Sequence, residues 1–350
     1  MGAHPGPLDH LRGVSPSPAE RRAAELLGGQ DEFIRRRRSH GAEGETFLRT
    51  LGAMVEQCEA RWGIRVVRTP WKLSRSFVAE AERADGTPCV LKLDARAEEI
   101  EALRVFDGRG SARVLDLDAE RRWLLLERLT PGTTLASLAD DDEATRIGAR
   151  VMRRLWRPVP AGHTLETLEE RGRAFERQRP VFGGGTGPFP EHLVVAAERV
   201  FAELPVGVEP MVLHGDAHHY NILHDTIREG CGRDEWLTID PHGVAGDPGY
   251  EVGCFIYNPN GNGPIPGDAL SPLKAPDPKA RVARRVAILA EELGWERERV
   301  RLWCLAQSVL SGWWHAEDGD ASDEEVAKMG CLAVAQLLYD MAPSLAHALR

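Results

Sequence analysis

The chain has 350 residues, of which 42% are hydrophobic and 28% are charged, and its formal net charge is −10. This length can bury a large core, no apolar run approaches the roughly 18 residues of a membrane span, and the first residues lack the apolar stretch of a secretory signal. We therefore expect a cytoplasmic protein with no membrane partner. The negative charge disfavours nucleic acid as a partner and permits a cationic small molecule. The six cysteines form no CxxC pair, which indicates reduced thiols in the core.

Proline, glycine and arginine dominate residues 1–40, which show no sustained apolar periodicity. The composition predicts a flexible N-terminal extension that is loosely attached and helical only near residues 19–27. A regular helix is expected at residues 43–62, because Phe47, Leu51 and Val55 fall on one helical face.

Short β-rich runs follow this helix and are broken by turn signals such as Asp85-Gly86, where we expect a hairpin. A helix is expected at residues 96–106, between the third and fourth strands. The predicted strands are residues 65–68, 76–82, 88–93, 112–117 and 123–129. Residues 41–129 are therefore predicted to form an N-lobe, a small antiparallel β-sheet with helical additions.

Helical periodicity dominates after residue 130. The predicted helices are residues 143–157, 191–204, 279–293, 298–314 and 323–339. Two short strands, residues 211–213 and 236–239, flank a polar motif. Residues 130–350 are therefore predicted to form a mainly helical C-lobe, and the whole chain an α+β fold with two lobes.

The polar motif reads HGDAHHYN at residues 214–221, and the second short strand ends in IDP at residues 239–241. Phosphoryl transfer needs a carboxylate to orient a hydroxyl and oxygen ligands for Mg²⁺. Asp216 is the candidate catalytic carboxylate, and Asn221 and Asp240 offer the oxygens that Mg²⁺ prefers. Each residue alone would be read as a turn or capping residue, but the three with this spacing favour a phosphotransfer site.

Lys92 lies within an apolar predicted strand, where an ammonium group is costly without a partner. Nucleotide phosphates are one possible partner, and a carboxylate on the next helix is another. The candidate carboxylates are Glu98, Glu99 and Glu101. An edge-strand lysine with its head in water is the alternative.

Two further segments are candidates for nucleotide contacts. Ser74 and Ser76, in the expected nucleotide-covering hairpin, could bind phosphate oxygens with their hydroxyls and neighbouring backbone N–H groups, although that hairpin has no GxGxxG. The backbone of residues 127–129 could hydrogen-bond an adenine edge. An ordinary hairpin and simple apolar burial explain the same residues.

Four histidines crowd the motif region and suggest a His-based metal site, as in a metallohydrolase. They are His214, His218, His219 and His224. There is no HExxH, and the adjacent His218 and His219 point to different faces of a regular element. We expect these side chains to pack and hydrogen-bond the loop, with His214 holding the catalytic segment.

With these residues assembled, the chain resembles the aminoglycoside phosphotransferase family, and within it the streptomycin 6-phosphotransferase and hydroxyurea phosphotransferase branch. The markers are LKL at residues 91–93, LLLERLTPGTTLASL at 124–138, HGDAHHYNIL at 214–223, WLTIDPHGVAGDPGYEVG at 236–253 and WWHAEDG at 313–319. The resemblance implies a protein-kinase-like two-lobed fold. At Ala217 and Glu251 the sequence departs from the residues usual in this family, but these differences leave the implied fold unchanged.

The resemblance also implies a role for each candidate residue. Asp216 would be catalytic, and Asn221 and Asp240 would hold Mg²⁺. Lys92 would bind the α- and β-phosphates of ATP and pair with Glu99. The remaining implied contacts are with adenine, through the backbone of Glu127 and Leu129.

The expected function is ATP- and Mg²⁺-dependent transfer of phosphate to a hydroxyl of a small molecule, an aminoglycoside antibiotic such as streptomycin, which gives resistance. A metabolic kinase acting on an amino alcohol, a sugar or a homoserine-like acceptor is the alternative. A catalytically inactive binding module and a His-based metallohydrolase remain as further hypotheses. The expected assembly is a monomer or weak dimer.

Overall fold

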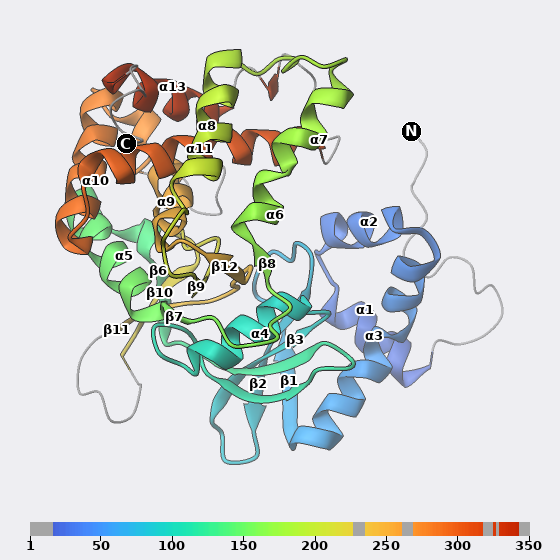
Figure 1. Ribbon diagram of the computed structural model, residues 1–350. Helices are drawn as coiled ribbons and strands as arrows, with labels where there is room; N and C mark the ends of the chain where they lie inside the picture. The colour runs from blue at the N-terminus through green and yellow to red at the C-terminus, as the bar shows by residue number, and fades with distance from the viewer. Residues whose placement is uncertain (1–16, 227–234, 261–268, 318–324, 327–328, 343–350) are drawn as a thin grey trace. The chain divides into compact units, whose positions relative to one another are not determined.

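The computed structural model describes residues 17–226, 235–260, 269–317, 325–326 and 329–342 (Figure 1). The chain divides into two compact units, which are described separately. Unit 1 comprises residues 1–96 and 114–128, and unit 2 comprises residues 97–113 and 129–350. Cys231, residues 1–16 of the predicted extension, and the start of the predicted last helix lie outside the described residues.

Unit 1 contains a five-stranded antiparallel sheet in the order β1-β2-β3-β5-β4. Its strands are β1 (Ile64–Arg68), β2 (Phe77–Arg83), β3 (Pro88–Leu93), β4 (Val114–Asp118) and β5 (Trp123–Glu127). The predicted hairpin is confirmed, because β2 pairs with β3 from Phe77 opposite Leu93 to Glu82 opposite Pro88. The long helix α3 (Gly41–Trp62) buries Leu51, Val55 and Cys58 in the same core as this sheet.

The predicted loose attachment of residues 1–40 is wrong for the described part of that segment. Helices α1 (Pro18–Leu26) and α2 (Asp31–Ser39) pack on α3 and bury Leu26 and Phe33 in the core of unit 1. The backbone of α1 reaches α3 at Gly52, where a Cβ atom would lie 1.8 Å from the carbonyl oxygen of Ala19. Both helices are therefore built into the unit.

Helix α4 (Ala97–Phe106) belongs to unit 2, whereas the sequence placed it in the predicted N-lobe. The reason is its apolar face, since Ala102 and Phe106 pack with residues of unit 2 such as Leu155. The first turn of α4 also closely approaches Gly243, where a Cβ atom would lie 2.3 Å from the carbonyl oxygen of Glu98. The packing of α4, rather than its position between β3 and β4 in the sequence, therefore decides the unit to which it belongs.

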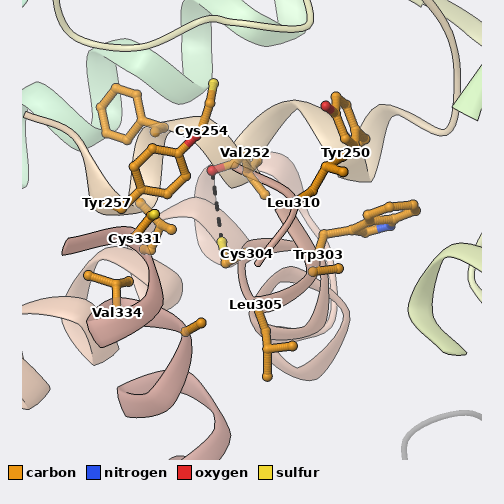
Figure 2. Packing of buried hydrophobic residues seen from close by; sticks show 14 of the residues in the cluster. Tyr250, Val252, Cys254, Tyr257, Trp303, Cys304, Leu305, Leu310, Cys331 and Val334 are labelled. Atoms are coloured by element: carbon orange, nitrogen blue, oxygen red, sulfur yellow. Dashed lines mark hydrogen bonds between the residues drawn. The ribbon is translucent and has the colours of Figure 1, made fainter. Parts of the chain in front are cut away.

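Unit 2 is mainly helical. Its longer helices are α5 (Asp141–Leu155), α7 (Ala174–Val181), α8 (Glu191–Glu203), α10 (Pro278–Leu293), α11 (Arg297–Glu317) and α13 (Gly330–Met341). The short ones are α6 (Leu168–Gly172), α9 (Gly253–Tyr257) and the 3-10 turns η1 (Leu135–Ser137), η2 (Pro248–Val252) and η3 (Pro272–Lys274). Helix α11 runs through the core, where Trp303 and Leu310 pack near Tyr250 and Cys331 (Figure 2).

The described cysteines are free thiols and all are buried. Three of them, Cys254 of α9, Cys304 of α11 and Cys331 of α13, lie in the core of unit 2 (Figure 2). The Cys304 thiol donates to the carbonyl oxygen of Val252 at 3.8 Å. Burial raises the pKa of Cys331 to about 11, which keeps this thiol protonated at neutral pH.

Short strands of unit 2 form two small sheets. One has the order β11-β10-β6 and the other the order β7-β9-β12-β8. The strands are β6 (Pro131–Thr134), β7 (Arg157–Pro158), β8 (Glu166–Thr167), β9 (Met211–Leu213), β10 (Ile222–Asp225), β11 (Glu235–Thr238) and β12 (Val244–Gly246). The sequence predicted only β9 and β11, because runs of two to four residues carry little periodicity.

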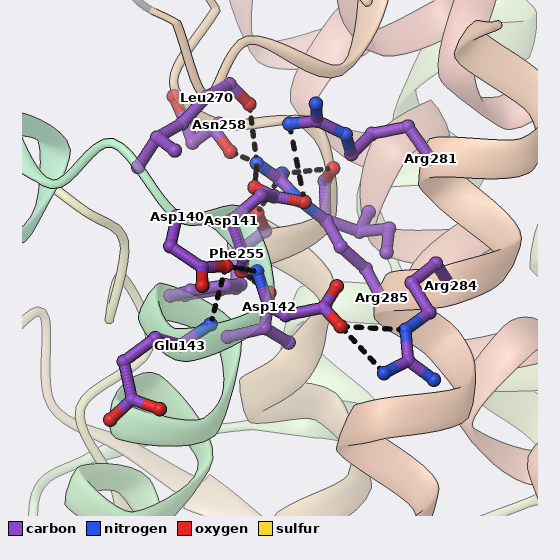
Figure 3. Close-up of polar contacts among 12 residues, drawn as sticks. Asp140, Asp141, Asp142, Glu143, Phe255, Asn258, Leu270, Arg281, Arg284 and Arg285 are labelled. Carbon is purple, nitrogen blue, oxygen red and sulfur yellow. Dashed lines mark hydrogen bonds and ion pairs between the residues drawn. The ribbon is translucent and has the colours of Figure 1, made fainter.

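A buried arginine joins three helices of unit 2 (Figure 3). Arg285 of α10 is fully buried and donates to both carboxylate oxygens of Asp141, at the start of α5. It also donates to the carbonyl oxygens of Phe255, in α9, of Asn258 and of Leu270. The N–H donors of this guanidinium therefore provide hydrogen bonds to a carboxylate and to backbone carbonyl oxygens that would otherwise be buried without partners.

In the part of the chain that the structure describes, every helix is too short or too polar to cross a lipid bilayer.

Candidate active site

Strand pairing in unit 2 brings the two predicted motif segments together. The HGDAHHYN segment leaves β9 and enters β10, and the IDP segment leaves β11 and leads to β12. β9 pairs antiparallel with β12, and β10 pairs antiparallel with β11, with Ile222 opposite Thr238. Asn221 and Asp240 consequently lie at the same end of the β10–β11 pair.

His214 fastens the two segments to each other. Its Nε2 donates to the carbonyl oxygen of Ile239 at 2.9 Å, and its Nδ1 accepts from the backbone N–H of Asp216 at 3.2 Å. The backbone N–H of His242 donates to the carbonyl oxygen of His214 at 2.7 Å. Burial lowers the pKa of His214 to about 4, so the ring is neutral and keeps this tautomer. His214 thus holds the two segments together as expected, and the catalytic role of the segment stays a prediction.

A buried carboxylate that the sequence did not assign to the site supports the start of the loop. Glu251, in η2, accepts from the backbone N–H of His214 at 2.7 Å and from that of Gly215 at 2.9 Å. Burial raises the pKa of Glu251 to about 7, against the opposing effect of these two N–H donors. The turn holding Glu251 is itself anchored by Asp247, which accepts from Gly249 N–H at 2.7 Å and from Trp303 Nε1 at 3.1 Å.

Asp216 lies among three nitrogen-bearing side chains. Its Oδ2 lies 3.5 Å from Nε2 of His218 and 3.6 Å from Nε2 of His242, and it accepts from Asn221 Nδ2 at 3.2 Å. Burial opposes ionisation of this carboxyl, but the imidazoles of His218 and His242 more than offset burial and hold its pKa below its usual range. Asp216 is therefore a carboxylate at neutral pH, which is the state that accepts a hydrogen bond from a hydroxyl.

Asn221 and Asp240 fit a hard cation by their chemistry. Asn221 Nδ2 also donates to the backbone oxygen of Asp216 at 2.9 Å, which leaves Oδ1 as the oxygen that could bind a cation. Asp240 has φ +58°, a left-handed conformation that non-glycine residues adopt rarely and that concentrates at functional sites. One amide oxygen and one carboxylate make an oxygen donor set of the kind Mg²⁺ prefers.

The other predicted site residues are divided between the units. Lys92 is buried near the end of β3, the central strand of the sheet, opposite Val78 and Leu124. Glu127 ends β5, and both residues belong to unit 1. Glu99, in the first turn of α4, and Leu129 are buried in unit 2. The pairing of Lys92 with Glu99 therefore stays a prediction.

The two serines proposed for phosphate binding differ in their surroundings. Ser76 is buried and its hydroxyl donates to the carbonyl oxygen of Asp94 at 3.0 Å. Ser74 is exposed. Because a hydroxyl has only one hydrogen to donate, Ser74 is the better candidate for a phosphate oxygen.

The histidines of the motif region are dispersed over different surroundings. His219 is buried and stacks on Phe255 with 3.9 Å between ring centroids, and His224 lies 4.9 Å from Trp236. Over the described ranges of the chain, no group of three or more His, Cys, Asp or Glu side chains has the arrangement of a metal site. The geometry gives the metallohydrolase hypothesis no support.

Known proteins are similar to this chain in sequence and in fold. Residues 61–319 match the family model described as "Aminoglycoside/hydroxyurea antibiotic resistance kinase". A streptomycin 6-kinase from Streptomyces griseus is 34% identical over 287 residues, which are 81% of this chain and 88% of that protein. A hydroxyurea phosphotransferase from Kitasatospora aureofaciens is 32% identical over 296 residues, 82% of this chain and 80% of that protein.

Among solved structures, choline kinase LicA from Streptococcus pneumoniae is similar with a TM-score of 0.53 at 11% identity, over 83% of this chain and 99% of that chain. At this identity the likeness concerns the fold alone, and it agrees with the predicted protein-kinase-like class. The chain belongs to the aminoglycoside/hydroxyurea antibiotic resistance kinase family and is a phosphotransferase.

Proposed function

We propose that this phosphotransferase moves the γ-phosphoryl group of ATP, in the presence of Mg²⁺, to a hydroxyl of a streptomycin-type aminoglycoside. The observation that carries the proposal is the arrangement of ionised Asp216 beside Asn221, with Asp240 at the same strand end. The streptomycin 6-kinase from Streptomyces griseus, similar along 88% of its length, supports the choice of acceptor. The net charge of −10 suits a cationic substrate.

Asp216 is proposed to accept a hydrogen bond from the acceptor hydroxyl and to align it for in-line attack. His218, His242 and the amide of Asn221 favour the ionised carboxylate. Glu251 and His214 fix the loop backbone, so the carboxylate is positioned before the substrate binds.

Asn221 and Asp240 are proposed to hold Mg²⁺ through an amide oxygen and a carboxylate. When bound, the ion neutralises charge on the phosphates. In unit 1, Lys92 and Ser74 are proposed to bind ATP phosphates, and the backbone of Glu127 to meet adenine. Leu129 in unit 2 is proposed as a second backbone contact with adenine, and Glu99 as the partner of Lys92.

Removing the Asp240 carboxylate tests the metal assignment. In Asp240→Ala, ATP affinity is expected to lose its dependence on Mg²⁺, because the charged ligand of the ion is gone. The measurement is ATP binding by titration calorimetry with and without Mg²⁺. Asp216→Asn is the matched control and should keep Mg²⁺-dependent binding. Unchanged Mg²⁺ dependence in Asp240→Ala would reject the assignment.

Hydroxyurea is a second candidate acceptor, because the hydroxyurea phosphotransferase from Kitasatospora aureofaciens is similar at nearly the same identity, 32%. An ATP-consumption screen with streptomycin, other aminoglycosides, hydroxyurea, choline and simple sugars separates the candidates. We expect the highest kcat/KM with streptomycin. A clear preference for hydroxyurea, or for choline or a sugar, would overturn the choice of acceptor and leave the phosphotransferase chemistry standing.

A further inference from the structure

The segment that joins β1 to β2, residues 69–76, is bonded to the N-terminal helices at every second residue. The hydroxyl of Thr69 donates to the carbonyl oxygen of Leu26, the last residue of α1. The backbones of Trp71 and Leu73 bond to Gln30, just before α2, and the backbone of Arg75 accepts from Arg37 of α2. All these residues belong to unit 1.

Gln30 binds this segment as a neighbouring strand would. Its Nε2 donates to the carbonyl oxygen of Trp71 at 2.9 Å, and its Oε1 accepts from the backbone N–H of Leu73 at 3.0 Å. The side chain is 9% exposed, so both bonds are shielded from water. Such a pair needs one donor and one acceptor on the same group, which a side-chain amide provides.

Arg37 extends the attachment to the strand that carries Lys92. Its guanidinium lies 4.1 Å from the ring centroid of Phe47, donates to the carbonyl oxygen of Arg75 and pairs with Asp94 at 2.8 Å. Asp94 follows β3 directly, and its carbonyl oxygen accepts from the hydroxyl of Ser76 at 3.0 Å. One side chain therefore fixes the end of the segment and the end of β3.

We infer that α1 and α2 are a positioning element for ATP, in which Gln30 and Arg37 hold residues 69–76 in the conformation that receives phosphate. The inference rests on the proposed function, in which Ser74 and Lys92 bind ATP phosphates. The segment, TPWKLSRS, contains no glycine. Ordering it in the free protein lowers the conformational cost of binding the nucleotide. Loss of the bonds from Gln30 and Arg37, the clamp on this segment, therefore weakens ATP binding.

Gln30→Met tests the inference, because methionine has a similar length and apolar body but makes neither hydrogen bond. We expect the KM for ATP to rise about tenfold, the loss associated with a buried hydrogen-bond pair. The KM for the acceptor and kcat at saturating ATP should be unchanged. Amide exchange over residues 71–75 should become faster. Glu32→Gln is the matched control in the same contact, since it removes only the exposed ion pair with Lys72 and leaves residues 69–76 unaltered, and it should change none of these quantities.

Each other outcome overturns the inference. Faster exchange with an unchanged KM for ATP would mean that the clamp does not serve the nucleotide. Unchanged exchange would mean that Gln30 does not hold the segment, and an equal rise in both KM values would indicate a general structural role. ATP affinity of the same variants by calorimetry keeps this test separate from the acceptor, so failure of wild-type protein to phosphorylate any acceptor would reject the proposed function alone.

Discussion

Asp216→Asn is expected to reduce kcat by about 10²–10⁴-fold while leaving ATP affinity nearly unchanged. Asparagine keeps the size of the side chain and can still accept a hydrogen bond, but it lacks the charge that would align and deprotonate the hydroxyl. In the structure the Asp216 carboxylate is held ionised by His218 and His242. The measurement is kcat with the preferred acceptor, together with ATP affinity by calorimetry.

The ATP titration is the control, because a misfolded variant would lose binding as well as turnover. Retention of more than a few per cent of wild-type kcat would remove Asp216 from its catalytic role. Loss of ATP affinity in parallel with kcat would instead show that the substitution disturbs the loop that Glu251 and His214 support.

Arg285→Met is expected to lower the free energy of unfolding by about 3–5 kcal/mol. Methionine fills part of the space but leaves Asp141 as a buried carboxylate without its main partner, and it removes donors from the carbonyl oxygens of Asn258 and Leu270 (Figure 3). Each orphaned buried group adds a desolvation cost. The measurement is denaturant unfolding of the variant and the wild type.

The neighbouring arginine provides a matched control on the same helix. Arg284 pairs with Asp142, but its side chain is 50% exposed and that of Asp142 is 34% exposed. Because exposed ion pairs contribute at most about 1 kcal/mol, Arg284→Met should change stability little. Similar losses in the two variants would contradict the central position that the structure gives Arg285.

Periodicity predicted the long elements of the fold well but not the N-terminal helices. Helices α10 and α11 bury regular apolar faces, and the signal is strong over such lengths. In contrast, α2 buries only Phe33 and Ile34 beside four arginines, so its sequence resembles a solvated surface. One of those arginines, Arg37, lies over the ring of Phe47 and pairs with Asp94. No pattern in a single sequence indicates these contacts.

The candidate site could be proposed from the sequence where short motifs mark its residues. Asp216 and Asn221 form one motif, and Asp240 follows two residues after the end of β11. Glu251 and His242 were not assigned to the site, because only the folded chain shows that Glu251 accepts from the loop backbone and that His242 lies beside Asp216. Ser76 was chosen for its hydroxyl, but its burial and its bond to Asp94 depend on tertiary packing.

The most direct test of the proposed function is the product that wild-type protein and Asp216→Asn form from ATP, Mg²⁺ and streptomycin. Mass spectrometry and phosphorus NMR would identify the product. The wild type should add one phosphoryl group to one hydroxyl of streptomycin, and Asp216→Asn should give almost no product under the same conditions. Equal product from both proteins, or a streptomycin product modified elsewhere than at a hydroxyl, would contradict catalysis of O-phosphorylation by Asp216.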